Sequence, residues 1–235
     1  MCTLGFTGYA WQYSNSLSIV TASHCSAVQG GNDYQTYYQP DTATQQALAG
    51  TALFAQEWVD PTFPYCANST ATYCRRADAL IATPGTQTFT DRIARTQTDA
   101  GPGMGAYGSI MINPDLPYFT IDDEEGPVMN ESLEKMGRTS GWTWGMVNHT
   151  CTTVDIGPAA DGKKRYLTCQ GRPNYQAGGG DSGAPVFRWP GDNTAILVGF
   201  HHRRHTNFFG NFDFSWFSSY WGMEGDLGPV ELWHP

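Results

Sequence analysis

Short runs rich in apolar and β-branched residues, separated by turn sequences, follow one another along most of the chain. These runs cover 3–10, 17–21, 51–59, 79–82, 92–96, 110–112, 118–121, 133–137, 142–147, 165–168, 184–187 and 195–200. Runs of this length between Gly, Pro, Asn and Ser residues are typical of β-strands. Only 218–227 has the composition of a short helix, which Gly228-Pro229 would end. The pattern therefore predicts an all-β fold with a short C-terminal helix.

The glycine-rich stretch 101–108 is the best candidate for a linker. It contains four glycines and one proline, which interrupt regular structure. We expect it to separate two domains of similar size, 1–105 and 106–235.

Composition narrows the class of protein. Forty per cent of the 235 residues are hydrophobic and 15% are charged, which excludes a disordered chain. A net charge of −9 argues against nucleic acid as a partner, because phosphate binding needs a basic surface. No apolar run approaches the roughly 18 residues needed to span a bilayer, so we expect no membrane partner either. The chain opens at Met1-Cys2 without a signal peptide, and we expect any secretory or pro-segment to have been removed.

The run Gly-Gly-Gly-Asp-Ser-Gly at 178–183, followed by an apolar strand, is typical of a nucleophile on a tight turn. Glycine permits the positive φ of such a turn, and successive N–H groups there can bind an oxyanion. Because a serine hydroxyl is a weak nucleophile, Ser182 needs a nearby base and a group that orients it. The α/β-hydrolase motif is excluded, since residue 184 is alanine where that motif requires glycine.

Two other stretches supply these groups, namely 20–25 with His24 and 76–81 with Asp78. Three other carboxylates that follow His24 (Asp33, Asp41 and Asp60) do not start an apolar strand. Asp78 does, so its carboxylate can be buried against an imidazole. The order His, Asp, Ser is the chymotrypsin order among serine triads.

These motifs resemble those of chymotrypsin-like serine endopeptidases, most closely the secreted bacterial trypsin-like peptidases, over most of the chain. The resemblance implies two six-stranded antiparallel β-barrels, the first with His24 and Asp78 and the second with Ser182. It implies hydrolysis of protein or peptide substrates through an acyl-enzyme by a monomer, with no metal or cofactor. The N–H groups of Gly180 and Ser182 would form the oxyanion hole.

The six cysteines allow fifteen pairings and point to a secreted protein. The resemblance favours Cys2–Cys25, and the remaining cysteines form two local couples, Cys66–Cys74 and Cys151–Cys169. A zinc site is the competing interpretation, but the sequence contains no CxxC.

The segment 135–142 resembles the bacterial strand motif in which an arginine pairs with the aspartate beside the nucleophile. We therefore expect Arg138 to neutralise Asp181, since the chain lacks the Ile-Val-Gly-Gly terminus that does so in animal enzymes. The alternative is a solvated Arg138.

For the substrate pocket, the resemblance implies Gln176 and Ala177 at the floor and the strand 200–205 as a wall. Its candidate substrate-binding residues are His201, His202, Arg203 and Arg204. Because a strand alternates faces, at least one should point inward and favour an acidic first substrate residue. In one alternative, the arginines face solvent and the site is neutral. In another, Arg203 or Arg204 fills the pocket and the chain is a binding protein.

Two metal sites are weaker interpretations. Residues 201 and 202 should face opposite sides of a strand, which disfavours a site built from His201, His202 and His205. The acidic run 122–125 is better explained as a solvated loop than as a calcium site, because calcium needs six to eight spaced oxygens.

Overall fold

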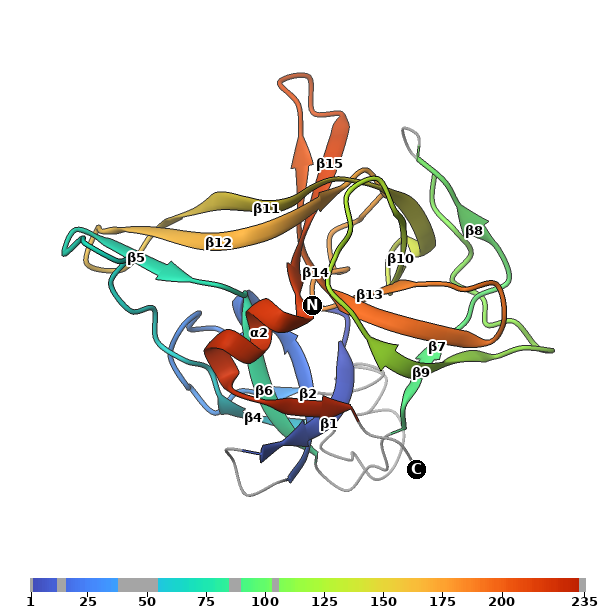
Figure 1. Cartoon of the computed structure of the whole chain (residues 1–235), viewed down its shortest axis with the longest axis horizontal. Coiled ribbons are helices and arrows are strands. Elements are labelled where there is room, and N and C mark those ends of the chain that lie inside the picture. Colours follow the sequence, from blue (N-terminus) through green and yellow to red (C-terminus); the bar gives the residue numbers. More distant parts are fainter. Residues whose placement is uncertain (1, 12–15, 38–54, 85–89, 103–105, 233–235) are drawn as a thin grey trace, which may run out of the picture.

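The computed structural model describes residues 2–11, 16–37, 55–84, 90–102 and 106–232, and it consists mainly of strands (Figure 1). The first half contains β1 Phe6–Ala10, β2 Ser16–Ala22, β3 Thr36–Tyr37, β4 Ala55–Val59, β5 Thr72–Arg75, β6 Ala79–Pro84, β7 Arg92–Ala94 and β8 Asp99–Ala100. The second half contains β9 Tyr118–Glu124, β10 Ser132–Gly137, β11 Gly141–Pro158, β12 Lys164–Pro173, β13 Pro185–Arg188, β14 Thr194–Thr206, β15 Phe212–Ser219 and β16 Val230–Leu232. A 3₁₀ turn, Ser23–Cys25, follows β2, and the helix α2 spans Tyr220–Leu227. The predicted all-β class is confirmed.

The strands form two sheets of different size. The first has the order β16-β1-β2-β6-β4-β3, and all its neighbours are antiparallel. In the second, β13-β10-β11-β12-β15-β14 are antiparallel neighbours, and β13 also pairs with β14. This last pairing closes a ring of six strands, to which β9 and β7 are added beyond β14.

Several elements connect the two halves of the chain. β7 and β8 precede residue 106 but pair with strands of the second sheet, whereas β16 pairs with β1. β5 runs parallel to β12 at the outer end of the long β11–β12 hairpin (Figure 1). The division into domains at residues 105 and 106 remains a prediction.

The apolar runs pack into a core that spans both sheets. One buried cluster contains Val20 and Ile81 from the first sheet together with Phe119, Leu197 and Phe200 from the second. The continuous run Ala-Leu-Ile-Ala at the start of β6 is fully buried, as expected for a strand covered on both faces. Both sheets therefore contribute to the rigid base that positions the loops described below.

Sequence patterns misplaced some elements. The run 110–112 forms no strand, because its side chains are largely exposed and only Ile112 makes an isolated bridge, with Thr96. β15 was not expected, since its Phe-Asp-Phe-Ser-Trp start follows a turn that the apolar pattern does not mark. The helix begins two residues later than predicted, where the Ser219 hydroxyl accepts a hydrogen bond from the Gly222 N–H. Parts of the expected turn 14–16, strand 51–59 and linker 101–108 lie outside the described residues.

The three disulfides are those that the local couples suggested. Cys2–Cys25 ties the N-terminal segment to the turn that contains His24. Cys66–Cys74 closes the loop before Asp78, and Cys151–Cys169 links β11 to β12. The first two disulfides therefore anchor segments next to His24 and Asp78, and the third stabilises the β11–β12 hairpin.

Candidate active site

The loop between β12 and β13 presents Ser182. Its backbone takes positive φ at Gly180 and Gly183, at 104° and 87°. A Cβ at residue 183 would lie 2.2 Å from the Thr3 carbonyl oxygen, so only glycine fits there. The Gly183 N–H donates to the His201 carbonyl and the Thr3 N–H to the Ser182 carbonyl, both within 2.8 Å. The N-terminal segment and β14 thus hold the serine from two sides.

His24 bridges Ser182 and Asp78. Its Nε2 lies 2.7 Å from Ser182 Oγ, and its Nδ1 makes a short hydrogen bond to Asp78 Oδ2. The structure therefore brings together the three residues that the sequence singled out, in the order hydroxyl, imidazole, carboxylate. This geometry lets the ring accept a proton from the hydroxyl while the carboxylate fixes its tautomer.

The Asp78 carboxylate is buried at the start of β6 and has further donors. Its Oδ1 accepts hydrogen bonds from the His24 N–H at 3.1 Å and from Gln29 Nε2 at 2.8 Å. Burial alone would raise the pKa of Asp78, but the charge and hydrogen bond of His24 hold it well below its usual range. Partial burial lowers the pKa of His24, and the Asp78 carboxylate more than offsets this, so the pKa of His24 lies above its ordinary value. Asp78 therefore stays ionised beside a basic imidazole.

Two further carboxylates, Asp60 and Asp226, hold the turns that carry the candidate triad. Ser23, next to His24, donates its hydroxyl proton to Asp60, which also pairs with the buried Arg75 at 2.9 Å. Asp226 of α2 accepts the backbone N–H groups of residues 76 and 77, just before Asp78. Sequence reasoning considered Asp60 only as a rival to Asp78, and it had no signal for the long-range contacts of Arg75 and Asp226.

The counterion of Asp181 is Lys135, and the expected Arg138–Asp181 pair is wrong. Lys135 Nζ lies 3.0 Å from Asp181 Oδ2, and both side chains are fully buried. Arg138 is exposed, and its backbone N–H donates to Thr3 Oγ1, whereas its side chain makes no hydrogen bond or ion pair with the described residues. Because strand β10 ends at Gly137, residue 138 lies in the following turn, whereas Lys135 points from β10 into the body.

Asp181 is the centre of a saturated buried network. Its carboxylate also accepts the N–H groups of Thr139, Ser140 and Gly178 and the Ser140 hydroxyl. Burial alone would raise the pKa of Asp181, but the Lys135 charge and these hydrogen bonds hold it below its usual range. The Gly178 bond ties the start of the loop that carries Ser182 to this network. Among the hydrogen bonds of the described residues, none has the Gly180 or Ser182 N–H as its donor, so both remain available to a ligand.

The expected pocket residues divide into buried and exposed groups. Gln176, Ala177, His201 and His202 are all at most 4% exposed, whereas Arg203 and Arg204 are exposed. Both histidines are buried, contrary to the expected alternation, because a β-bulge between residues 201 and 203 leaves His202 outside the pairing with β15. Burial lowers the pKa of both, that of His202 to about 4, so both are neutral near pH 7.

A cleft of about 250 Å³ opens beside the triad. It is lined by His24, Gln29, Asp78, Ile156, His202 and Arg203. Ile156 comes from the outer half of β11, which sequence patterns did not predict as a strand, and Gln29 from a polar loop that carried no motif. Arg203 is the cation at this cleft, and its Nη1 donates to the Asp155 carbonyl at 3.0 Å.

No protein-family model matches the sequence, and no curated protein is significantly similar to it. Solved structures do match over nearly the whole chain. Protease A of Thermobifida fusca matches with a TM-score of 0.60 at 16% identity, covering 99% of this chain and 92% of that one. Nocardiopsis protease gives 0.57 at 17% identity, covering 98% and 92%. A glutamic acid specific serine protease, described as using a histidine triad in substrate binding, gives 0.61 at 16% identity, covering 99% and 93%. The chain therefore has the chymotrypsin-like fold of bacterial serine proteases.

Proposed function

We propose that this protein is a secreted serine endopeptidase with the triad His24, Asp78 and Ser182. The observation that carries the proposal is the His24 ring, which contacts Ser182 Oγ at 2.7 Å through Nε2 and Asp78 through Nδ1. The protease fold and three disulfides support the assignment and an extracellular location.

The mechanism follows from the roles of these groups. Ser182 Oγ attacks the scissile carbonyl carbon while His24 Nε2 takes its proton. As the tetrahedral intermediate collapses, His24 gives this proton to the leaving amine, and the acyl group stays on Ser182. A water molecule then gives a proton to His24 and attacks the acyl carbon. The second tetrahedral intermediate collapses, Ser182 Oγ takes the proton back, and the carboxylic acid product leaves. Asp78 remains ionised and stabilises the imidazolium in both steps.

The oxyanion of the intermediate would bind to the N–H groups of Gly180 and Ser182. One such donor contributes about 3–4 kcal/mol in comparable sites. Asp181, the partner of Lys135, binds the N–H of Gly178, two positions before Gly180 in the same loop. We therefore assign Lys135 as a positioning residue of this loop.

We further propose that substrates with an acidic side chain are preferred, and that Arg203 is the recognising group. It is the cation at the cleft beside His24, whereas His201 and His202 are neutral and buried. The glutamic acid specific protease of similar fold is described as using histidines for substrate binding. In this chain an arginine takes that role, since its guanidinium can bind a carboxylate through two N–H groups. The rival binding-protein interpretation requires Arg203 or Arg204 to fill the pocket. Both side chains are exposed, and Arg203 lines a cleft that stays open beside it, which favours the enzyme.

Turnover of casein and of a positional peptide library tests both parts. Wild type should cleave, and Ser182→Ala should not, although its melting temperature stays unchanged. Arg203→Gln should keep cleavage of neutral peptides while losing the preference for Glu or Asp. Equal turnover by the Ser182→Ala variant contradicts the triad, and a wild type that cleaves only after neutral or basic residues contradicts the acidic preference.

A further inference from the structure

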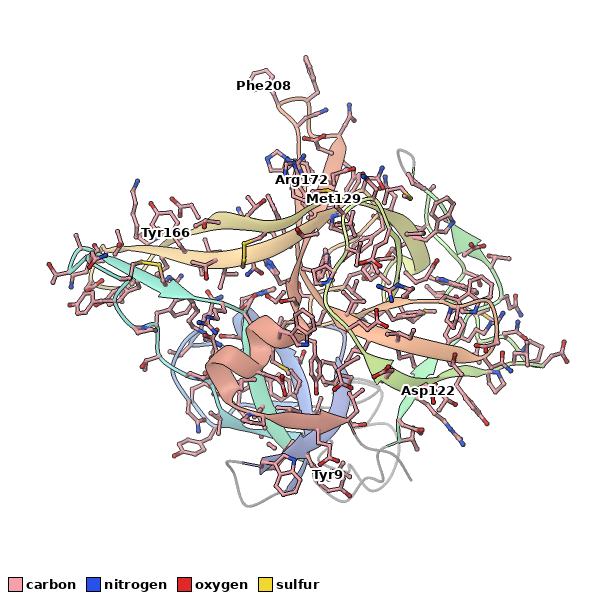
Figure 2. The ribbon with its side chains drawn as sticks, viewed as in Figure 1. Tyr9, Asp122, Met129, Tyr166, Arg172 and Phe208 are labelled. Atoms are coloured by element: carbon pink, nitrogen blue, oxygen red, sulfur yellow. A yellow bond between two sulfur atoms is a disulfide. The ribbon has the colours of Figure 1, made fainter. Side chains whose placement is uncertain are left out.

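The hairpin formed by the outer halves of β14 and β15 ends in two adjacent, exposed phenylalanines. Phe208 is 98% exposed and Phe209 is 82% exposed, the highest values among the large apolar side chains of the described chain. Their rings contact each other edge to face, with centroids 5.6 Å apart. Figure 2 shows Phe208 at the outer end of the hairpin, beyond the rest of the molecule. Such concentrated apolar exposure marks an interaction site.

The turn that carries these rings is held by its own hydrogen bonds. Asn207 Oδ1 accepts the N–H groups of Phe209 and Asn211, at 3.0 and 3.1 Å. The Asn207 backbone also bonds to Asn211 and Gly210, and Gly210 has a φ of 78°. The two rings are therefore presented outward by a defined turn, and neither folds back onto the strands.

The strands below the tip carry cations. Arg204 is exposed on β14. Arg172 comes from the neighbouring strand β12 and is half-buried, with its guanidinium 4.8 Å from the centre of the Phe214 ring on β15. His205 stacks on the same ring, and Phe214 in turn contacts Trp216. Figure 2 places Arg172 at the base of the hairpin. The stalk below the tip also carries one carboxylate, Asp213, whose Oδ2 lies 3.4 Å from His205 Nδ1. Arg203, Arg204 and Arg172 outnumber it, so the stalk is basic although the whole chain has a net charge of −9.

The size and shape of the tip favour a lipid surface over a protein partner. Two phenylalanines bury at most about 300–500 Å² together. A stable protein interface needs about 800 Å² from each partner and a complementary pocket for a convex tip. A bilayer needs no pocket, and apolar side chains enter the boundary between headgroups and acyl chains by about 5–10 Å. Arg204 lies two residues before β14 ends at Thr206, which is about 7 Å along the strand from the turn that carries the phenylalanines. This places it on the headgroup side of rings that enter the boundary between headgroups and acyl chains.

We propose that Phe208 and Phe209 dock the protein on an anionic lipid surface, with Arg204 and Arg172 near the phosphates. Among the described residues no helix is long and apolar enough to cross a bilayer. The expectation of no membrane partner rested on the lack of a spanning segment, and interfacial docking through a hairpin tip needs none. The proposal does not depend on the peptidase activity.

Co-sedimentation with vesicles tests it on the whole chain. We expect wild type to bind vesicles of phosphatidylcholine mixed with phosphatidylglycerol more tightly than pure phosphatidylcholine, and less tightly as salt rises. Phe208→Ser/Phe209→Ser should reduce binding at least tenfold, and Arg204→Gln about fivefold. The matched control, Ile110→Ser/Met111→Ser, removes an exposed apolar pair elsewhere and should leave binding unchanged. Absence of wild-type binding, or equal binding by the tip variant, overturns the proposal.

A labelled cysteine gives a second readout, which reports the polarity around the tip itself. All six cysteines are in disulfides, so Phe208→Cys supplies a single free thiol for a polarity-sensitive dye. Its emission should shift to the blue on anionic vesicles, whereas a dye at Met111→Cys should not respond. A wild type that is dimeric in sedimentation, a monomeric tip variant and no vesicle response would instead assign the tip to a second copy of the chain and overturn the lipid proposal. Casein turnover in solution should be equal for wild type and the tip variant.

Discussion

Lys135 Nζ and Asp181 Oδ2 form an ion pair with a distance of 3.0 Å, and both side chains are fully buried. Asp181 is the residue directly before Ser182. Ser140 completes the pair, since its hydroxyl lies 2.6 Å from both Lys135 Nζ and Asp181 Oδ2. Lys135 takes the role that was expected of Arg138, which is to neutralise the aspartate in a chain without the Ile-Val-Gly-Gly terminus. The loop that carries Ser182 therefore depends on a cation that comes from the interior of β10.

Lys135→Met should destabilise the protein by about 3–5 kcal/mol and lower kcat, because it leaves a buried carboxylate without its partner. Arg138→Ala is the matched control, and its effect should stay within about 0.5 kcal/mol. Urea unfolding and peptide kinetics measure both. Lys135→Met/Asp181→Asn should recover part of the stability, because the uncompensated charge is gone. A Lys135→Met variant with wild-type stability and kcat would show that the pair has no such role.

The pH dependence of kcat/KM should report the basicity of His24. The pKa of His24 lies above its ordinary value of about 6.5, and only the neutral ring can accept the Ser182 proton. Activity should therefore fall as the pH is lowered through a midpoint above about 6.5. Asp78→Asn should cost about 10⁴-fold in kcat, since the ring loses its tautomer-fixing acceptor. An acid limb below pH 6 in wild type is the outcome that this interpretation does not allow.

Gln29→Ala tests the additional donor to Asp78. The Gln29 amide contacts Asp78 Oδ1 at 2.8 Å. A hydrogen bond to a charged group contributes about 1.5–3 kcal/mol to stability, so the variant should unfold more easily. Its kcat should also fall, because the Asp78 carboxylate is held less firmly against His24. Gln97→Ala, at an exposed position, serves as the control. Equal kcat values for the two variants would remove Gln29 from the positioning of the triad.

Glu134→Gln should stabilise the protein at high pH. Burial raises the pKa of Glu134 to about 7, and its Oε2 accepts the Trp142 indole N–H. The unfolded chain releases this proton near pH 4.5, so wild-type stability should decrease as the pH rises from 4.5 through 7. The variant keeps the acceptor and lacks the charge, and it should gain up to about 3 kcal/mol at pH 8. Melting curves at pH 5 and pH 8 check this, and an equal shift at both values contradicts it.

The sequence was sufficient to predict most strands of the core and to single out the members of the candidate triad, but it missed β15 with its buried Phe217. The start of β6 is apolar on both faces, which marks a buried strand in the sequence. The Gly-Asp-Ser-Gly turn is visible in the sequence because its positive φ angles require glycine. Lys135 was not predicted, because a lysine in a strand normally faces solvent. The available signal was the pair Glu134-Lys135 within an otherwise apolar run, which no solvent-facing alternation explains.

The neighbourhood of the substrate was harder to predict, because it depends on irregular and long-range contacts. The bulge at His202 buries two successive histidines, and no local pattern announces it. Ile156 reaches the cleft because β11 continues to Pro158 through the mostly polar stretch Asn148–Asp155. Such a stretch does not show the apolar pattern of a strand. Arg75 and Asp226 are 151 positions apart, and only the fold brings them together.

Labelling by a fluorophosphonate probe is the most direct test of the central claim that Ser182 is an activated nucleophile. After incubation of the purified protein, peptide mass spectrometry should find the probe on Ser182 alone. Labelling should be lost in Ser182→Ala and strongly slowed in His24→Ala, with both variants folded. A wild type that stays unlabelled, or that reacts equally fast without His24, would contradict the account.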